Sequence, residues 1–101
     1  QVVDRVKQET SDGDQIYIWD SHVQMYKESQ RLAGSMFPSP LLYTSTEENK
    51  TSLINDLKEN QPKVIVVNDK VALWSEAETL LKENYQQVKT DYSEFKVYKI
   101  K

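Results

Sequence analysis

The chain contains no cysteine, and only two of its 101 residues are glycine and three are proline. The lack of cysteine excludes disulfides, thiolate metal sites and a cysteine nucleophile. No apolar run approaches the roughly 18 residues that a membrane-spanning helix needs. Basic residues are fewer than acidic ones, 13 against 16, so the positive surface that nucleic-acid binding requires is missing. We therefore expect no nucleic-acid partner. A chain without cysteine is compatible with both reducing and oxidising compartments.

The length of the chain limits the number of domains that it can form. A chain of this size buries one hydrophobic core, so we expect residues 1–101 to form a single domain. The sequence begins at Gln1 rather than at a methionine. We interpret it as a fragment of a larger protein, in which targeting or membrane segments belong to the parent chain.

Two segments have the pattern of buried strands. In residues 15–19, Ile16 and Ile18 point to one side of a strand while Tyr17 and Trp19 point to the other, so both faces are apolar. Residues 64–67 are four consecutive β-branched residues, which is typical of a strand covered on both faces. Alternation around Val88 and in residues 95–98 predicts two later strands.

Helical spacing of apolar residues recurs between these strands. It predicts a short helix from Val2 that ends at the turn formers 10–14, and a weak helix around residues 23–27. Ser45 and Ser75, each with a glutamate three residues later, predict the starts of two more helices. These helices should end near Pro62 and Asn84, respectively.

The alternation of strands and helices predicts the fold class. We expect a small layered α/β sandwich: a mainly parallel sheet of about four strands with an antiparallel last strand, and helices on both faces. Residues 31–43 contain Gly34, Pro38 and Pro40 and are predicted to be an irregular loop that carries large apolar side chains.

The candidate site lies where parallel strands end, because ligands of open α/β sheets bind beyond the carboxyl ends of the strands. The residues there are Trp19, Asp20, Ser21 and His22 after the first strand, and Asn68, Asp69 and Lys70 after the second. His22 is the only histidine; it either carries a phosphoryl group or a proton, or merely starts a helix. Asp20 and Asp69 form a carboxylate pair if the strands are neighbours, or act as caps and turn residues.

The aromatic residues Trp19, Tyr26, Phe37 and Tyr43 concentrate in one part of the chain. Such rings stack on sugars or insert at a membrane interface, but core packing is the simpler use of Trp19 and Tyr26. No glycine-rich phosphate loop and no ligand spacing for a metal are present, so we expect no cofactor and no catalysis by this chain alone.

The order of these features resembles a known family. In the first half of the chain, the features are the 11–14 turn before the strand 15–19, followed by Tyr26, Arg31 and residues 37–40. In the second half, they are Asn60-Gln61-Pro62-Lys63 before the strand 64–67, and residues 81–85 leading to 95–98. Together they resemble the soluble C-terminal domain of bacterial polytopic membrane glycosyltransferases of the dolichyl-phosphate-mannose protein mannosyltransferase-like superfamily. The matching positions are Trp19, Tyr26, Arg31, Phe37 and Pro38, whereas Asp20 stands where relatives often have glycine.

The resemblance implies a parent protein in the cell membrane that takes sugar from a polyprenyl-phosphate-linked donor. This domain would lie on the extracytoplasmic face as a non-catalytic accessory, because the catalytic acidic residues of that family lie in its membrane part. Its implied partners are the membrane-embedded part of the parent chain and a polyprenyl-phosphate sugar or glycan acceptor. We expect residues 31–43 to make that contact, with Arg31 on a phosphate and the aromatic rings on a sugar, unless they are a packed loop with a surface arginine.

Two other functions remain open from the residues. A phosphohistidine carrier would use His22, with Lys27 and Arg31 as the nearby cations. A free-standing protein-interaction module would need no catalytic residue and no membrane segment.

Overall fold

In the computed structural model, β1 (Gln15–Trp19) and β3 (Val64–Asn68) lie side by side in parallel near the centre of one sheet. Ile16, Tyr17, Ile18 and Val66 have almost no exposed surface. This confirms that both strands are covered on both faces. The structure describes residues 2–20, 24–35, 37–41, 46–90, 92 and 94–101.

The sheet is open and mixed, with strand order β2-β1-β3-β5-β4. β2 (Leu32–Ala33) pairs with β1 in parallel, whereas β5 (Phe95–Ile100) is antiparallel to both of its neighbours, β3 and β4 (Tyr85–Val88). The prediction that the last strand is antiparallel to its predecessor is confirmed. The predictions of about four strands and a mainly parallel sheet are wrong, because β2 forms inside the supposed loop and β5 inserts between β3 and β4.

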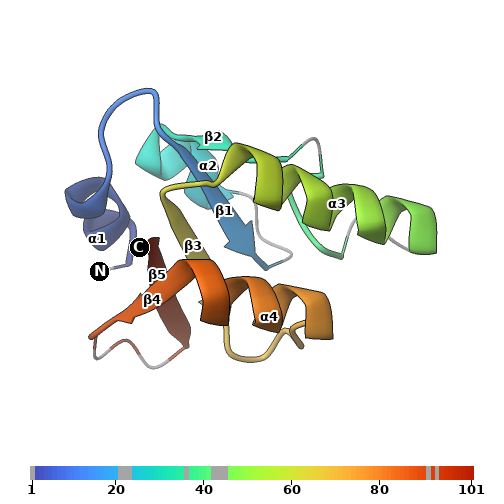
Figure 1. Ribbon diagram of the computed structural model, residues 1–101. Helices are drawn as coiled ribbons and strands as arrows, with labels where there is room; N and C mark the ends of the chain where they lie inside the picture. The colour runs from blue at the N-terminus through green and yellow to red at the C-terminus, as the bar shows by residue number, and fades with distance from the viewer. Residues whose placement is uncertain (1, 21–23, 36, 42–45, 91, 93) are drawn as a thin grey trace.

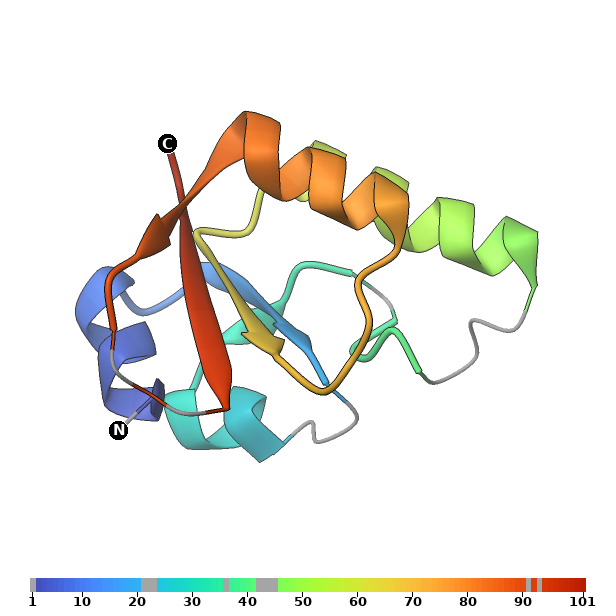
Figure 2. The same ribbon diagram turned by 90° about the horizontal axis from the view of Figure 1, so that it is seen from below.

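Helices cover both faces of the sheet, as predicted. On one face α1 (Val2–Glu9) and α2 (Gln24–Ser29) pack on the isoleucines of β1, and Figure 2 shows this layer below the sheet. On the other face α3 (Glu47–Asn60) and α4 (Ser75–Asn84) pack on Tyr17 and Trp19. Figure 1 shows these two helices running side by side. The result is three layers, helix, sheet and helix.

The starts of α3 and α4 differ in detail from the sequence prediction. The N-cap of α3 is Thr46, whose Oγ1 accepts a hydrogen bond from the Asn49 amide at 3.2 Å, while Ser45 lies outside the described residues. At α4 the N-cap is Trp74, without a side-chain cap bond, so the predicted capping box at Ser75 is wrong. The end of α3 is as predicted, with Gln61 in the left-handed conformation before Pro62.

Gly34 joins β2 to the rest of the sheet by a close backbone approach. Its amide donates to the Ile16 carbonyl at 2.9 Å, and its own carbonyl accepts from Asn60 Nδ2 at 2.8 Å. A Cβ at this position would lie 2.4 Å from Cγ of the buried Pro62. Only glycine therefore fits between β1 and the segment that leads into β3.

We expect Gly34→Ala to lower the free energy of unfolding by about 1–3 kcal/mol, because an added methyl group forces a well-packed interior apart. Urea denaturation of the purified domain measures this difference. The control is the double-mutant cycle with Pro62→Ala, which removes the Cγ that the methyl group would meet. Gly34→Ala should cost less in that background, and equal costs in both backgrounds would contradict the proposed clash.

Candidate functional site

The carboxyl ends of β1 and β3 do meet, as the sequence predicts. Asp20 follows β1 and is 4% exposed, and Asn68 Nδ2 donates to its Oδ2 at 3.2 Å. Asp69 instead lies 3.6 Å from Lys96 Nζ on β5. The two aspartates thus have different partners, an amide and an ammonium group, and these contacts do not support the carboxylate pair considered above. His22 lies outside the described residues, so its phosphoryl-carrier role stays a prediction.

Trp19 is part of the core and not of a ligand surface. It is 1% exposed, and its Nε1–H donates to the Ala72 carbonyl at 3.0 Å. Its ring also meets the Trp74 ring edge-on, with centroids 4.9 Å apart. Trp19 therefore anchors the segment between β3 and α4, and the core-packing alternative is the one the structure supports.

Tyrosine hydroxyls hold Phe37 and Pro38 against β1. Ile18 lies beyond the two residues of β1 that pair with β2, and its amide donates to the Tyr26 hydroxyl at 2.9 Å. Tyr26 donates in turn to the Pro38 carbonyl at 2.9 Å, and Tyr17 donates to the Phe37 carbonyl at 2.7 Å. The Phe37 side chain is half-buried against the α3–α4 face. Within the expected contact loop, Phe37 and Pro38 are thus held on their own domain, whereas Leu32 and Leu41 are exposed. Tyr43 lies outside the described residues.

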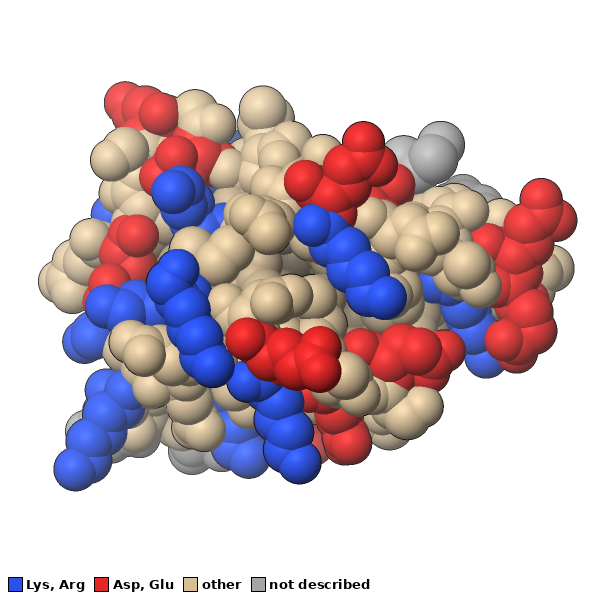
Figure 3. All heavy atoms as spheres, in the orientation of Figure 1, with Lys and Arg blue, Asp and Glu red and all other residues tan. Residues whose placement is uncertain are grey.

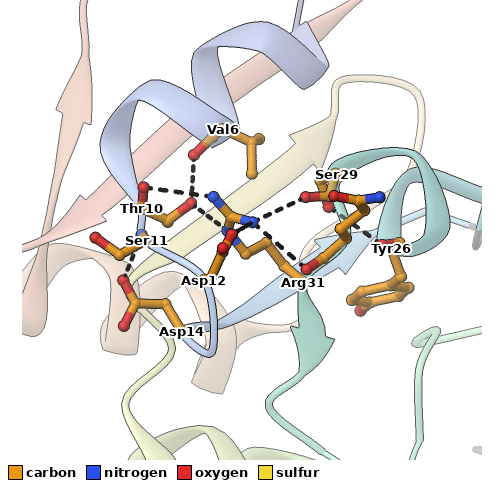
Figure 4. A network of polar contacts seen from close by, with 9 residues as sticks. Val6, Thr10, Ser11, Asp12, Asp14, Tyr26, Ser29 and Arg31 are labelled. Carbon is orange, nitrogen blue, oxygen red and sulfur yellow. Dashed lines mark hydrogen bonds and ion pairs between the residues drawn. The ribbon is translucent and has the colours of Figure 1, made fainter.

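Arg31 is a buried clamp on the turn between α1 and β1. Its side chain is 6% exposed, and its Nε donates to Thr10 Oγ1 at 2.8 Å. Nη1 donates to the carbonyls of Ser29 and Gln30, and Asp12 accepts a further bond at 3.2 Å (Figure 4). Because the Asp12 side chain is fully exposed, its ion pair is screened by water and the hydroxyl and carbonyl acceptors matter more. A guanidinium held in this way is not the surface group that phosphate binding requires.

We expect Arg31→Met to lower the free energy of unfolding by about 1–3 kcal/mol, because it leaves buried oxygen acceptors without a donor. Chemical denaturation measures the loss. Arg5→Met is the matched control: it breaks the partly exposed ion pair of Arg5 with Glu9, which should contribute about 1 kcal/mol or less. Equal effects of the two substitutions would contradict the clamp.

The buried tyrosines also predict how stability depends on pH. Burial raises the pKa of Tyr17, Tyr26 and Tyr85 above the ordinary value of about 10. The folded state therefore keeps these protons to a higher pH than the unfolded state does. The resulting stability is complete below about pH 10 and is lost as the pH rises beyond it.

Urea denaturation at a series of alkaline pH values measures this loss as a falling free energy of unfolding. Tyr85→Phe removes one of the three buried hydroxyls, so the slope above about pH 10 should become shallower by up to about 1.4 kcal/mol per pH unit. An unchanged slope in this variant would show that Tyr85 does not contribute.

A hollow among the described residues lies between α4 and the adjacent end of the sheet. This α4 groove has a volume of about 530 Å³ and is lined by Leu73, Glu78, Leu81, Lys82, Tyr85, Gln87, Lys96 and Tyr98. A smaller hollow of about 180 Å³ continues it toward Asp69 and shares four of these residues. Leu81 of α4 and Tyr85 of β4 belong to the core cluster on this face of the sheet, while Tyr98 of β5 is only partly buried and lines the groove.

The groove has an apolar floor and a charged rim. Tyr85 is fixed in the floor by a 2.6 Å hydrogen bond from its hydroxyl to the Pro62 carbonyl. Glu78, Lys82 and Lys96 provide the charges, and the exposed Gln87 closes the side at β4. Sequence reasoning placed none of these residues in a site. The signal that was available is the polar pair Gln86 and Gln87 within a strand, which indicates a strand at the edge of a sheet.

One family model matches the chain over residues 1–101, and its description is "Putative competence-induced protein Ccs4 C-terminal domain". The chain belongs to this family. Comparison with curated proteins and with solved structures found no match.

This family assignment corrects the resemblance drawn from the order of sequence features. The chain belongs to a different family from the glycosyltransferase superfamily proposed above. Within the described part of the chain, no helix has the length and hydrophobicity to cross a membrane. The resemblance rested on short segments such as 15–19 and 64–67, which many α/β domains share because buried strands select the same apolar residues. The membrane location and the lipid-linked sugar partner lose the support that the resemblance gave them.

Proposed function

We propose that this domain is a non-catalytic interaction domain that docks a segment of another protein in the α4 groove. The observation that carries the proposal is the groove itself, an apolar floor with a charged rim at an open end of the sheet. Its volume of about 530 Å³ is within the range of about 300–1,000 Å³ that is usual for binding sites. Grooves of this composition bind through the apolar floor and gain orientation from the rim.

The binding residues suggested by the sequence already have hydrogen-bond partners inside the domain, which favours the groove as the binding surface. Trp19 and Arg31 are buried and hydrogen-bonded within the domain. The Tyr26 hydroxyl bridges the Ile18 amide and the Pro38 carbonyl, so it already has a donor and an acceptor. The groove residues Lys82 and Gln87, in contrast, are exposed and face a hollow. Docking is therefore the function that the described surface supports best.

A matched pair of neighbouring residues tests the proposal. Gln87 lines the groove, whereas Gln86 is directed to the opposite face, where its partner Lys99 lies beside Glu9 of α1. Peptides are first selected against the immobilised domain from a random library displayed on phage, and their affinities are then measured for Gln87→Trp and Gln86→Trp. The first variant fills the groove with an indole and the second places the same indole outside it.

We expect Gln87→Trp to weaken binding of the selected peptides by at least about tenfold, or about 1.4 kcal/mol, and Gln86→Trp to leave it nearly unchanged. Circular dichroism and thermal unfolding show that both variants remain folded. Failure to select any peptide that the two variants distinguish would refute docking in the groove.

A further inference from the structure

The outer edge of β4 presents main-chain groups to a further strand. β4 is the last strand of the strand order, and the Asn84 carbonyl just before it accepts a hydrogen bond from the Lys101 amide at 3.0 Å. Along an antiparallel pair, residues that point their main-chain groups toward the neighbour alternate with residues that point them away. The register with β5 therefore directs the groups of Asn84 toward β5 and those of Tyr85 and Gln87 outward.

The outward groups form a pattern that is complementary to itself. The Tyr85 amide already donates to the Leu81 carbonyl at the end of α4, so Tyr85 presents its carbonyl alone to a further strand. Gln87 presents both a donor and an acceptor. Lys89, the residue that directly follows β4 and the next one in the outward series, presents an amide donor. Read in reverse, this order of acceptor, donor with acceptor, and donor supplies the partner that each group needs.

We infer that β4 pairs with β4 of a second copy of this chain, antiparallel and about a two-fold axis at Gln87. The two Gln87 residues then exchange a pair of hydrogen bonds, and each Lys89 amide donates to the Tyr85 carbonyl of the other copy. An axis at Gln86 would need the Tyr85 amide, which is occupied by α4. An axis at Val88 would rely further on residues beyond the end of β4. The two five-stranded sheets become one continuous sheet.

In this register no two like charges lie directly opposite each other. β4 itself contains no charged residue, and the pairing sets Lys89 opposite Tyr85 and Gln87 opposite Gln87. Figure 3 shows basic side chains toward the β4–β5 end and acidic ones along α4. Of the basic residues, Lys96 and Lys99 belong to β5 and already lie beside acidic residues of their own copy. The paired positions are therefore not subject to the direct repulsion that keeps many edge strands apart.

A second copy is favoured over a foreign segment because its strand is already ordered. α4 at one end and β5 along one side hold β4 in its extended conformation. An unstructured segment loses conformational entropy when it adds to the edge, whereas two preformed strands lose little. β4 has no charge, proline or bulge that would block the pairing. Its length of four residues makes the contact small, so we expect a weak dimer.

The pairing also brings two α4 grooves together. Directly opposed residues of an antiparallel pair lie on the same face of the sheet, so Tyr85 and Gln87 of both copies share one face. Because Gln87 lies where each groove ends at β4, the two grooves meet at the axis, and Gln87 of the second copy extends the lining of the first groove. A docked segment can then extend across both copies. This last step rests on the proposed docking function, whereas the pairing itself does not.

Cross-linking tests the axis directly, because the chain has no cysteine of its own. Opposed residues that exchange hydrogen bonds have Cα atoms about 5.5 Å apart, within the range of about 4.4–6.8 Å that a disulfide spans. Gln87→Cys should therefore give a disulfide-linked dimer in an oxidising glutathione buffer. Gln86→Cys is the matched control: it is equally exposed, but its two copies would be diagonal neighbours about 7–8 Å apart and should cross-link poorly. Equal cross-linking of the two variants would overturn the proposed axis.

Sedimentation equilibrium measures the association itself, up to a domain concentration of about 1 mM. We expect the unaltered domain to form a dimer whose share rises with concentration. Gln87→Pro removes the outward N–H, at a position where an edge strand tolerates proline, and should weaken the dimer by at least about tenfold. Gln87→Ala removes the side chain but keeps the N–H, and should leave the dimer nearly unchanged. Circular dichroism and thermal unfolding show whether both variants remain folded.

The pairing and the docking function can fail separately. A domain that stays monomeric up to about 1 mM, or a dimer that Gln87→Pro does not weaken, would overturn the pairing while library peptides still bind the groove. Amide hydrogen exchange at Gln87 that slows only when a library peptide is added would assign the edge to a foreign strand and would also overturn the pairing. Failure of the library selection, with a dimer that cross-links through Gln87→Cys, would overturn the docking function alone.

Discussion

Strands β1 and β3 are buried on both faces, which requires a helical layer on each side of the sheet. Ile16 and Ile18 are covered by α1 and α2, while Tyr17 and Trp19 are covered by α3 and α4. Full burial of such side chains contributes about 1.5–3 kcal/mol each. Among the described residues these two strands hold eight of the twenty buried hydrophobic ones, a large share of the apolar contribution to stability. The outer strands do not need to be covered on both faces. β4 has two exposed residues at its centre and is therefore free to serve as a surface.

The parts of the fold that the sequence could predict are those encoded by local pattern. The 15–19 and 64–67 strands, the stop of α3 at Pro62 and the antiparallel hairpin at the end follow from periodicity and turn residues. β2 could not be predicted, because its two residues have no periodicity and pair only because the edge of β1 is available. The insertion of β5 between β3 and β4 is a long-range pairing that no local pattern encodes.

The candidate residues were chosen because their side chains can bind ligands. In the structure, Trp19, Tyr26 and Arg31 use these polar groups in hydrogen bonds within the domain. An arginine with five donors, or a tyrosine whose hydroxyl both donates and accepts, is as suitable for satisfying buried main-chain groups as for binding a ligand. Arg31 secures the 10–14 turn, and Tyr26 replaces the strand partner that β2 is too short to provide. The groove could not be found from sequence, because its lining comes from α4, β4 and β5 and forms only when these elements pack together.

The two edges of the sheet are unequal, and this difference links the fold to its surface chemistry. The β2 edge is only two residues long and is followed by a segment that hydroxyl groups hold in place. At the other edge, β4 emerges directly from α4, so its position is set by the helix and by its pairing with β5. β4 itself carries no charge, so it is its shortness that limits what its edge offers to another chain.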